Sequence, residues 1–121
     1  MTNLNKVSVV KCTDYSKEDI RSAVDKTFAF FGGIENVIKK GSKVLLKPNF
    51  LKESSPRKCI VTHPAVIEAV AEAVLEAGAT PIIGDSPAFG SVAKIASRIG
   101  LDKFAEKHGI DIIELDKPRK V

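Results

Sequence analysis

Three short polar groups hold the side chains of this sequence that are best suited to binding or catalysis: Lys47-Pro48-Asn49, Thr62-His63-Pro64 and Asp85-Ser86-Pro87. In the first group, an ammonium is followed by an amide that can both donate and accept hydrogen bonds. Lys47 and Asn49 together could therefore bind an anion. The alternative is that the lysine stands in solvent and the asparagine bonds the backbone of its own turn.

The second group ends in a proline, which suits the first turn of a helix. Thr62 and His63 are both candidates for the residue that caps this helix, and capping is the role that we favour for Thr62. His63 could instead be a hydrogen-bond donor that titrates near neutral pH. Because no paired nucleophile accompanies it, catalysis is the less favoured role, and the catalytic residues stay unknown.

The third group belongs to a segment with two glycines, residues 84–91, that leads from a predicted strand into a predicted helix. Such a loop suits a ligand held at a helix N-terminus. It is neither a phosphate loop of the Walker type nor a G-x-G-x-x-G motif. Asp85 could coordinate Mg²⁺ or accept a hydrogen bond from a hydroxyl group, and with Ser86 it could equally form an ordinary turn.

Alternating strands and helices must position these groups. β-rich runs bounded by turn or charged residues predict four strands, at residues 6–10, 43–47, 80–84 and 111–115. Helical periodicity predicts helices over 20–31, 64–78 and 91–108, the first ended by Gly32-Gly33 and the last broken near Gly100. This alternation is typical of βαβ units with right-handed crossovers. We therefore expect an α/β fold, with a mainly parallel sheet of about four strands and helices packed on it.

Such a fold predicts where a ligand would bind. Ligands of open parallel sheets lie beyond the carboxyl ends of the strands, because the loops converge there and helix N-termini point unpaired N–H groups into the crevice. We expect the polar groups to meet at this edge, as a binding site for a small molecule or anion. Its predicted residues are Lys47, Asn49, Thr62, His63, Asp85 and Ser86.

Two further segments are less specific. Glu68, Glu72 and Glu76 recur at every fourth position of the predicted helix over 64–78, and we interpret this stripe as a solvated face. Residues 51–61 form a polar connection that is long enough to be a mobile lid or a simple excursion of the chain.

Composition predicts a folded protein in the cytoplasm. Hydrophobic residues make up 44% and charged residues 28% of the chain, which is ordinary for a globular domain. The net charge is +4, but the basic residues are scattered among fifteen acidic ones, so nucleic acid is disfavoured as a partner. No apolar run is long enough to span a bilayer, and the first ten residues lack the pattern of a secretory signal.

The cysteines predict no metal centre within this chain. Cys12 and Cys59 lie far apart in the sequence, without the spacing of a metal site or the density of a disulfide scaffold, and we expect two reduced thiols. An iron–sulfur cluster needs about four cysteine ligands, which these two cannot supply.

At the polar groups, the sequence resembles the family catalogued as domain of unknown function 362. The resemblance covers most of the chain from Val7 onward and rests on the order and spacing of Val44-Leu45-Leu46-Lys47-Pro48-Asn49, Thr62-His63-Pro64, Gly84-Asp85-Ser86-Pro87 with Gly90-Ser91, and Leu115-Asp116-Lys117. Members are typically longer, and many carry ferredoxin-like modules. The resemblance therefore implies a link to iron–sulfur redox metabolism, with any cluster in a C-terminal part beyond this chain.

Three functions remain open from the sequence. We favour an N-terminal, small-molecule or anion-binding part of a larger protein, because the predicted alternation stops after residues 111–115 without a closing helix. Residues 1–121 would then be a single α/β domain or the N-terminal fragment of a longer one. The alternatives are a stand-alone, non-catalytic metabolite-binding module and a protein-interaction module. The expected partners are the ligand, the rest of the parent protein or a second copy of this chain. The sequence does not assign an enzyme class.

Overall fold

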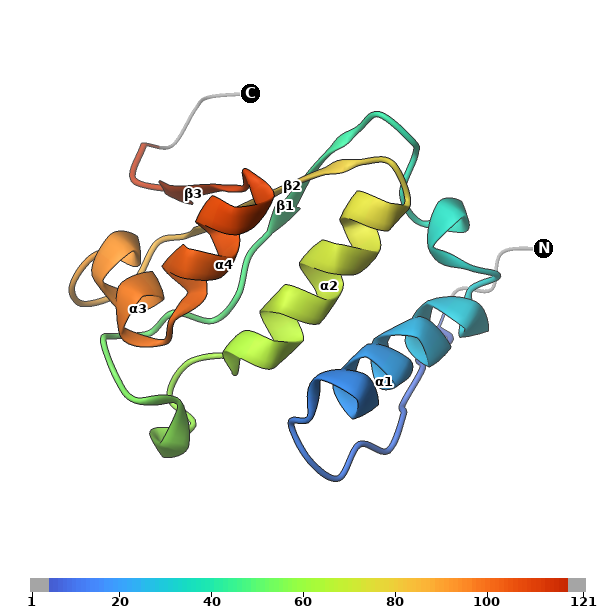
Figure 1. Ribbon diagram of the computed structural model, residues 1–121, viewed down its shortest axis with the longest axis horizontal. Helices are drawn as coiled ribbons and strands as arrows, with labels where there is room; N and C mark the ends of the chain where they lie inside the picture. The colour runs from blue at the N-terminus through green and yellow to red at the C-terminus, as the bar shows by residue number, and fades with distance from the viewer. Residues whose placement is uncertain (1–4, 118–121) are drawn as a thin grey trace.

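The computed structural model describes residues 5–117 and shows a three-stranded sheet with helices on it (Figure 1). The strands are β1 (Lys43–Leu46), β2 (Thr80–Asp85) and β3 (Asp111–Glu114). The α-helices are α1 (Lys17–Phe30), α2 (Pro64–Glu76), α3 (Val92–Arg98) and α4 (Leu101–His108), with 3-10 turns η1 (Ile34–Asn36) and η2 (Pro56–Lys58).

The sheet is parallel throughout, and its strand order follows the sequence. β2 lies in the middle, with Lys43 of β1 opposite Thr80 and Ile82 opposite Asp111 of β3. Both crossovers run in the same direction across the sheet, and right-handed crossovers of this kind place their helices on one face. α2 accordingly contacts β1 and β2, while α3 and α4 contact β3 (Figure 1). The expected α/β fold with a parallel sheet is confirmed.

The core lies between the sheet and this single helical layer. Ile83 in the central strand, Ile95 in α3 and Leu101 at the start of α4 are fully buried, and Phe50 joins them from the loop after β1. Gly100 separates α3 from α4 with a positive φ of 78°, a conformation that glycine adopts without strain. This break lets one apolar stretch of sequence fold back on itself over β3.

In the described part of the chain the sheet has three strands, and the predicted strand at residues 6–10 is wrong. These residues have no regular secondary structure, and Val7 and Val9 are 77% and 90% exposed. Val10 lines a hollow of about 240 Å³ between α1 and α2. The alternating valines favour a strand locally, but a strand needs a neighbour, and this segment lies along the helices instead of beside β1.

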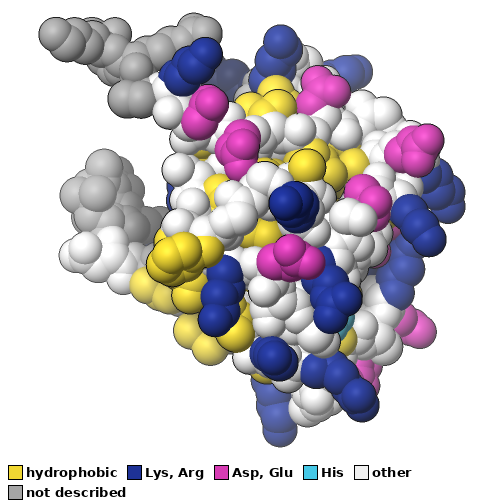
Figure 2. Space-filling view, turned by 90° about the vertical axis from the view of Figure 1, so that its left-hand side faces the viewer, with side chains coloured by type: hydrophobic (Ala, Val, Ile, Leu, Met, Phe, Trp, Pro, Cys, Tyr) yellow, Lys and Arg dark blue, Asp and Glu magenta, His cyan; other side chains and the backbone are white. Residues whose placement is uncertain are grey.

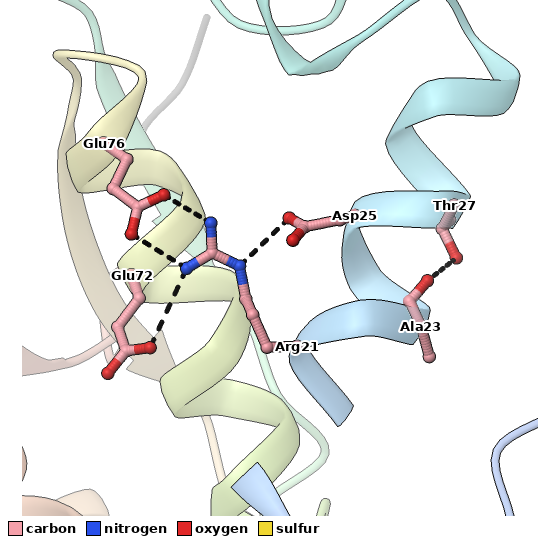
Figure 3. Close-up of polar contacts among 6 residues, drawn as sticks. All are labelled: Arg21, Ala23, Asp25, Thr27, Glu72 and Glu76. Carbon is pink, nitrogen blue, oxygen red and sulfur yellow. Dashed lines mark hydrogen bonds and ion pairs between the residues drawn. The ribbon is translucent and has the colours of Figure 1, made fainter. Parts of the chain in front are cut away.

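Glu72 and Glu76 both pair with α1 (Figure 3), and the solvated face that their spacing suggests holds for Glu76, whose side chain is 66% exposed, but not for Glu72, at 17%. Arg21 donates to both carboxylate oxygens of Glu76 and to Asp25 in its own helix, with a longer contact of 3.9 Å to Glu72. Lys17 pairs with Glu72 at 2.9 Å. Glu72 and Glu76 therefore attach α1 to the outer side of α2.

None of the helices among residues 5–117 is long and apolar enough to cross a membrane. Cys12 and Cys59 are both free and exposed.

Candidate functional site

Lys47 and Asp85 join the carboxyl ends of the first two strands. Lys47 directly follows β1, Asp85 is the last residue of β2, and the lysine Nζ lies 2.9 Å from the aspartate Oδ1. The Asp85 side chain is 6% exposed, whereas that of Lys47 is 61% exposed. The carboxylate is thus built into the fold, and the ammonium remains open to solvent.

The second oxygen of Asp85 holds the loop that follows β1. Asp85 Oδ2 accepts a hydrogen bond from the backbone N–H of Phe50 at 2.7 Å, and the N–H of Ser86 also bonds to this side chain. Burial by itself would raise the pKa of Asp85, but the Lys47 ammonium and these two N–H groups outweigh burial and hold the pKa below its ordinary value. Asp85 is therefore a charged group that anchors the loop after β1 to the end of β2.

Thr62 fastens the loop after β1 to the start of α2, and it does not cap that helix. The N–H of Thr62 donates to the Asn49 carbonyl at 3.1 Å, and the N–H of Asn49 donates to Thr62 Oγ1 at the same distance. Phe50 and Val61 form an antiparallel bridge beside them. The connection 51–61 is thus a loop with its ends tied together, and it contains η2. The prediction that Thr62 caps α2 is wrong, because the Thr62 hydroxyl oxygen already accepts a hydrogen bond from the N–H of Asn49.

His63 is the residue that caps α2. Its backbone is extended, and its Nδ1 accepts a hydrogen bond from the N–H of Ala65 at 3.2 Å, so the neutral ring carries its proton on Nε2. Tyr15, from the segment before α1, stacks on the imidazole. Burial lowers the pKa of His63, because it disfavours the charged ring. The histidine is therefore held neutral at the helix start.

The loop between β2 and α3 is tied to its neighbours on both sides. The N–H of Phe89 donates to the Leu51 carbonyl at 3.4 Å, and the N–H of Leu115 donates to the carbonyl of Asp85 at 2.9 Å. Glu114, at the end of β3, accepts from the N–H of Val92 at 3.0 Å. The loops after all three strands are therefore linked at one edge of the sheet.

The structure thus brings the six predicted site residues together at the carboxyl edge, and we call this cluster the edge site. Two chains of contacts make it, one through the Lys47–Asp85 ion pair and one through the Asn49–Thr62 hydrogen bonds, with Phe50 bonded to Asp85 between them. The members of the edge site are Lys47, Asn49, Thr62, His63, Asp85 and Ser86. Their role in binding a ligand stays a prediction.

Sequence patterns did not identify three residues that contribute to this edge. The Phe50 contact is made by a backbone N–H, which any residue but proline could supply, so its type carries no signal. Tyr15 lies far from His63 in the sequence, and no periodicity relates the two. Glu114 stands in a predicted strand, and only its position beside α3 shows that it satisfies a helix N–H.

The chemistry of the edge site follows from its open donors. Asn49 and Ser86 are exposed, and Lys47 has ammonium protons beyond the one directed at Asp85. These groups can donate hydrogen bonds to an anion or to a polar small molecule. Within residues 5–117, no cluster of three or more His, Cys, Asp or Glu side chains is arranged to hold a metal ion.

Comparison with known proteins places this edge in a family. The model of a family described as domain of unknown function (DUF362) matches residues 44–121, which include all six residues of the edge site. The chain belongs to this family. The DUF362 match begins at the second residue of β1 and covers the rest of the sheet, so nearly all the residues that build the sheet and its carboxyl edge are those that the family model describes.

A curated relative extends the match to most of the chain. This relative, named as a thylakoid-associated protein of Synechocystis, is 37% identical over 108 residues, which are 89% of this chain and 34% of the relative. The chain therefore spans about a third of the length of the curated protein that it matches. No solved structure matches the chain.

Proposed function

We propose that this chain is the part of a larger DUF362 protein that binds a small anionic ligand at the edge site. The observation that carries the proposal is the Lys47–Asp85 contact at 2.9 Å, which holds an exposed ammonium at the ends of two parallel strands. Open parallel sheets bind their ligands at this edge. Asn49 and Ser86 supply further donors there.

The N-terminus of α2 adds to the attraction. This helix has thirteen residues and starts at Pro64, next to the Thr62–Asn49 hydrogen bonds. The dipole of α2 gives this end a partial positive charge that favours an anion by roughly 0.3–1 kcal/mol, although Pro64 has no N–H and the Ala65 N–H is already bonded to His63. Because Asp85 offsets the charge of Lys47, we expect binding to be weak and to rely on directed hydrogen bonds as well as on charge.

A titration with inorganic phosphate tests the proposal. Phosphate added to the isotope-labelled chain at low salt should shift the amide signals of the loops after β1 and β2, as followed by nuclear magnetic resonance. Lys47→Met should weaken binding several-fold, and the loss should shrink at high salt, where surface charges are screened. Lys43→Met is the matched control, because Lys43 is also an exposed lysine but begins β1, at the end of the strand opposite to Lys47.

The two lysines make the outcome decisive. Equal losses in Lys47→Met and Lys43→Met would show that phosphate responds to net charge alone, and the edge site would be ruled out as an anion site. The folded Asp85→Asn variant distinguishes two modes of anion binding. Binding should tighten if the anion contacts Lys47 directly, and it should weaken if a cation such as Mg²⁺, added with phosphate, bridges the anion to the carboxylate.

The wider part of the proposal concerns the whole protein. The resemblance to DUF362 proteins supports an iron–sulfur cluster outside these 121 residues, since two exposed cysteines supply fewer ligands than a cluster needs. A stand-alone metabolite-binding or protein-interaction module is the second candidate. Leu45 of β1 and Ile113 of β3 are large apolar side chains that are 49% and 38% exposed, and this favours an interaction role.

A further inference from the structure

One face of the sheet carries apolar side chains with no helix of residues 5–117 over them. Leu45 of β1 and Ile113 of β3 are 49% and 38% exposed. Gly84 lies between them in β2, and a Cβ there would stand 2.8 Å from Ile113 Cγ1 and 3.2 Å from Leu45 Cδ1. The glycine therefore lets the two side chains close over the middle strand. We call Leu45, Ile82, Gly84 and Ile113 the open face.

The helical layer cannot cover the open face. Side chains alternate along a strand, so Leu46 and Ile83 point toward the helices and core, whereas Leu45 and Gly84 point away. Both crossovers use the core side, and α1 packs on α2 instead of on the sheet. In the space-filling view, hydrophobic side chains gather at the lower left, and charged side chains are spread over the rest of the visible surface with smaller apolar areas between them (Figure 2).

The free edge of β1 is apolar on the helix side as well. A groove of about 630 Å³ runs along this strand, lined by Val44 and Leu46 together with Phe28 of α1 and Val70 and Val74 of α2. β1 pairs with β2 on one side, and no other described strand pairs with it. An unpaired strand with apolar surface on both sides is a template for pairing with another strand.

We propose that a parallel strand from the remainder of a whole DUF362 protein pairs with the free edge of β1, and that its helix covers the open face. Parallel sheets occur almost only with both faces covered. The relative is about three times as long as the region it shares with this chain, so such proteins have ample polypeptide for the second layer.

The handedness of crossovers indicates that the helix joined to the added strand lies on the open face and not on the face that already carries helices. β1, β2 and β3 extend the sheet in one direction, so a strand added beyond β1 extends it in the other. A right-handed crossover to that side places its helix on the opposite face, which is the open face. The strand order then reverses at β1, and the edge site lies at the reversal point, where ligands of such sheets bind.

Co-expression of this chain with the residues of the Synechocystis relative outside the match tests the proposal. We expect a complex with one copy of each, in which amide hydrogen exchange in β1 slows by at least about tenfold while exchange in α1 is unchanged. Leu45→Lys should abolish the complex. Phe30→Lys should leave it intact, because Phe30 is similarly exposed, at 51%, but lies at the end of α1 away from the sheet.

A second experiment applies if the polypeptide from the relative does not fold by itself. The two polypeptides joined in one chain should unfold in a single transition, and Leu45→Lys should split it into two. Two independent transitions without the substitution, unchanged exchange in β1, or insensitivity to Leu45→Lys would each overturn the proposal. So would a dimer of this chain that Leu45→Lys dissociates in sedimentation, since a second copy would then be the occupant.

Discussion

Tyr15 lies flat against His63, with the ring centroids 3.8 Å and the ring planes 14° apart. The stack shields the imidazole that caps α2, and it brings the segment before α1 to the start of the second helix. A neutral histidine suits both contacts, because protonated Nδ1 could no longer accept the hydrogen bond from Ala65.

The cap predicts a loss of stability in mild acid. The pKa of His63 is lowered in the folded chain, so between this pKa and the ordinary value of 6.5 the unfolded chain binds more protons. The stabilising contribution is complete above about pH 6.5 and is lost as the pH falls toward the lowered pKa. Urea unfolding from pH 8 to pH 5 should show this decline. His63→Asn, which keeps a capping side chain, should flatten it, and an unchanged slope would contradict the assignment.

Asp85 should matter more to stability than its partner. Asp85→Asn weakens bonds from Lys47 and from two backbone N–H groups around a buried carboxylate, and we expect it to cost about 1–3 kcal/mol of unfolding free energy. Lys47→Met should cost less than about 1 kcal/mol, because the ammonium is exposed. Chemical denaturation of both variants measures the difference. Equal costs would mean that the ion pair, not the backbone contacts, holds the loop.

The lowered pKa of Asp85 also sets an acid limit. The unfolded carboxyl group has the higher pKa, so the stability that Asp85 contributes is present above about pH 4 and is lost as the pH falls through the folded value. The Asp85→Asn variant should therefore lose less stability than the natural chain between pH 5 and pH 2.

Gly84 should tolerate no side chain while Ile113 is present. Gly84→Ala places a methyl group 2.8 Å from Ile113 Cγ1, and relieving this overlap should cost about 1–3 kcal/mol. Adding Ile113→Ala to Gly84→Ala should recover much of the loss relative to Ile113→Ala alone. Unfolding free energies of the two single variants and the double variant give the coupling, and additive costs would argue against this contact.

Arg21 should carry most of the polar attachment of α1. Its side chain is only 22% exposed and binds carboxylates from two helices, so Arg21→Met should lower the unfolding free energy by about 1 kcal/mol at low salt and by less at high salt. Lys17→Met is the control, because Lys17 is 80% exposed and should contribute little. A double-mutant cycle of Arg21 with Glu76 measures their coupling directly.

The helices and the last three strands were predictable because local patterns agree with the packing. Gly32-Gly33 ends the first helix just past Phe30, Pro64 starts α2, and Gly100 divides the last helical stretch. The meeting of Lys47 with Asp85 followed from topology alone, since parallel strands end at one edge.

What the sequence concealed depends on contacts between distant segments. The valines of residues 6–10 alternate as a strand does, yet no described strand lies beside them. Glu72 looks solvated within its own helix and is paired once α1 lies against α2. Thr62 and His63 are both reasonable caps for α2. Only the hydrogen bond from the Asn49 N–H to the threonine hydroxyl, which the sequence does not reveal, decides between them.

The sequential order of β1, β2 and β3 bears on how the chain is made. Each strand pairs only with strands that precede or follow it directly, so a growing polypeptide that leaves the ribosome adds every strand to an edge already present. β2 can pair with β1 once α2 has been made, and β3 can then pair with β2. Neither step threads the chain or displaces a strand pair that has already formed. We expect assembly during synthesis to advance from the N-terminus in steps of one crossover, leaving the edge of β1 available throughout.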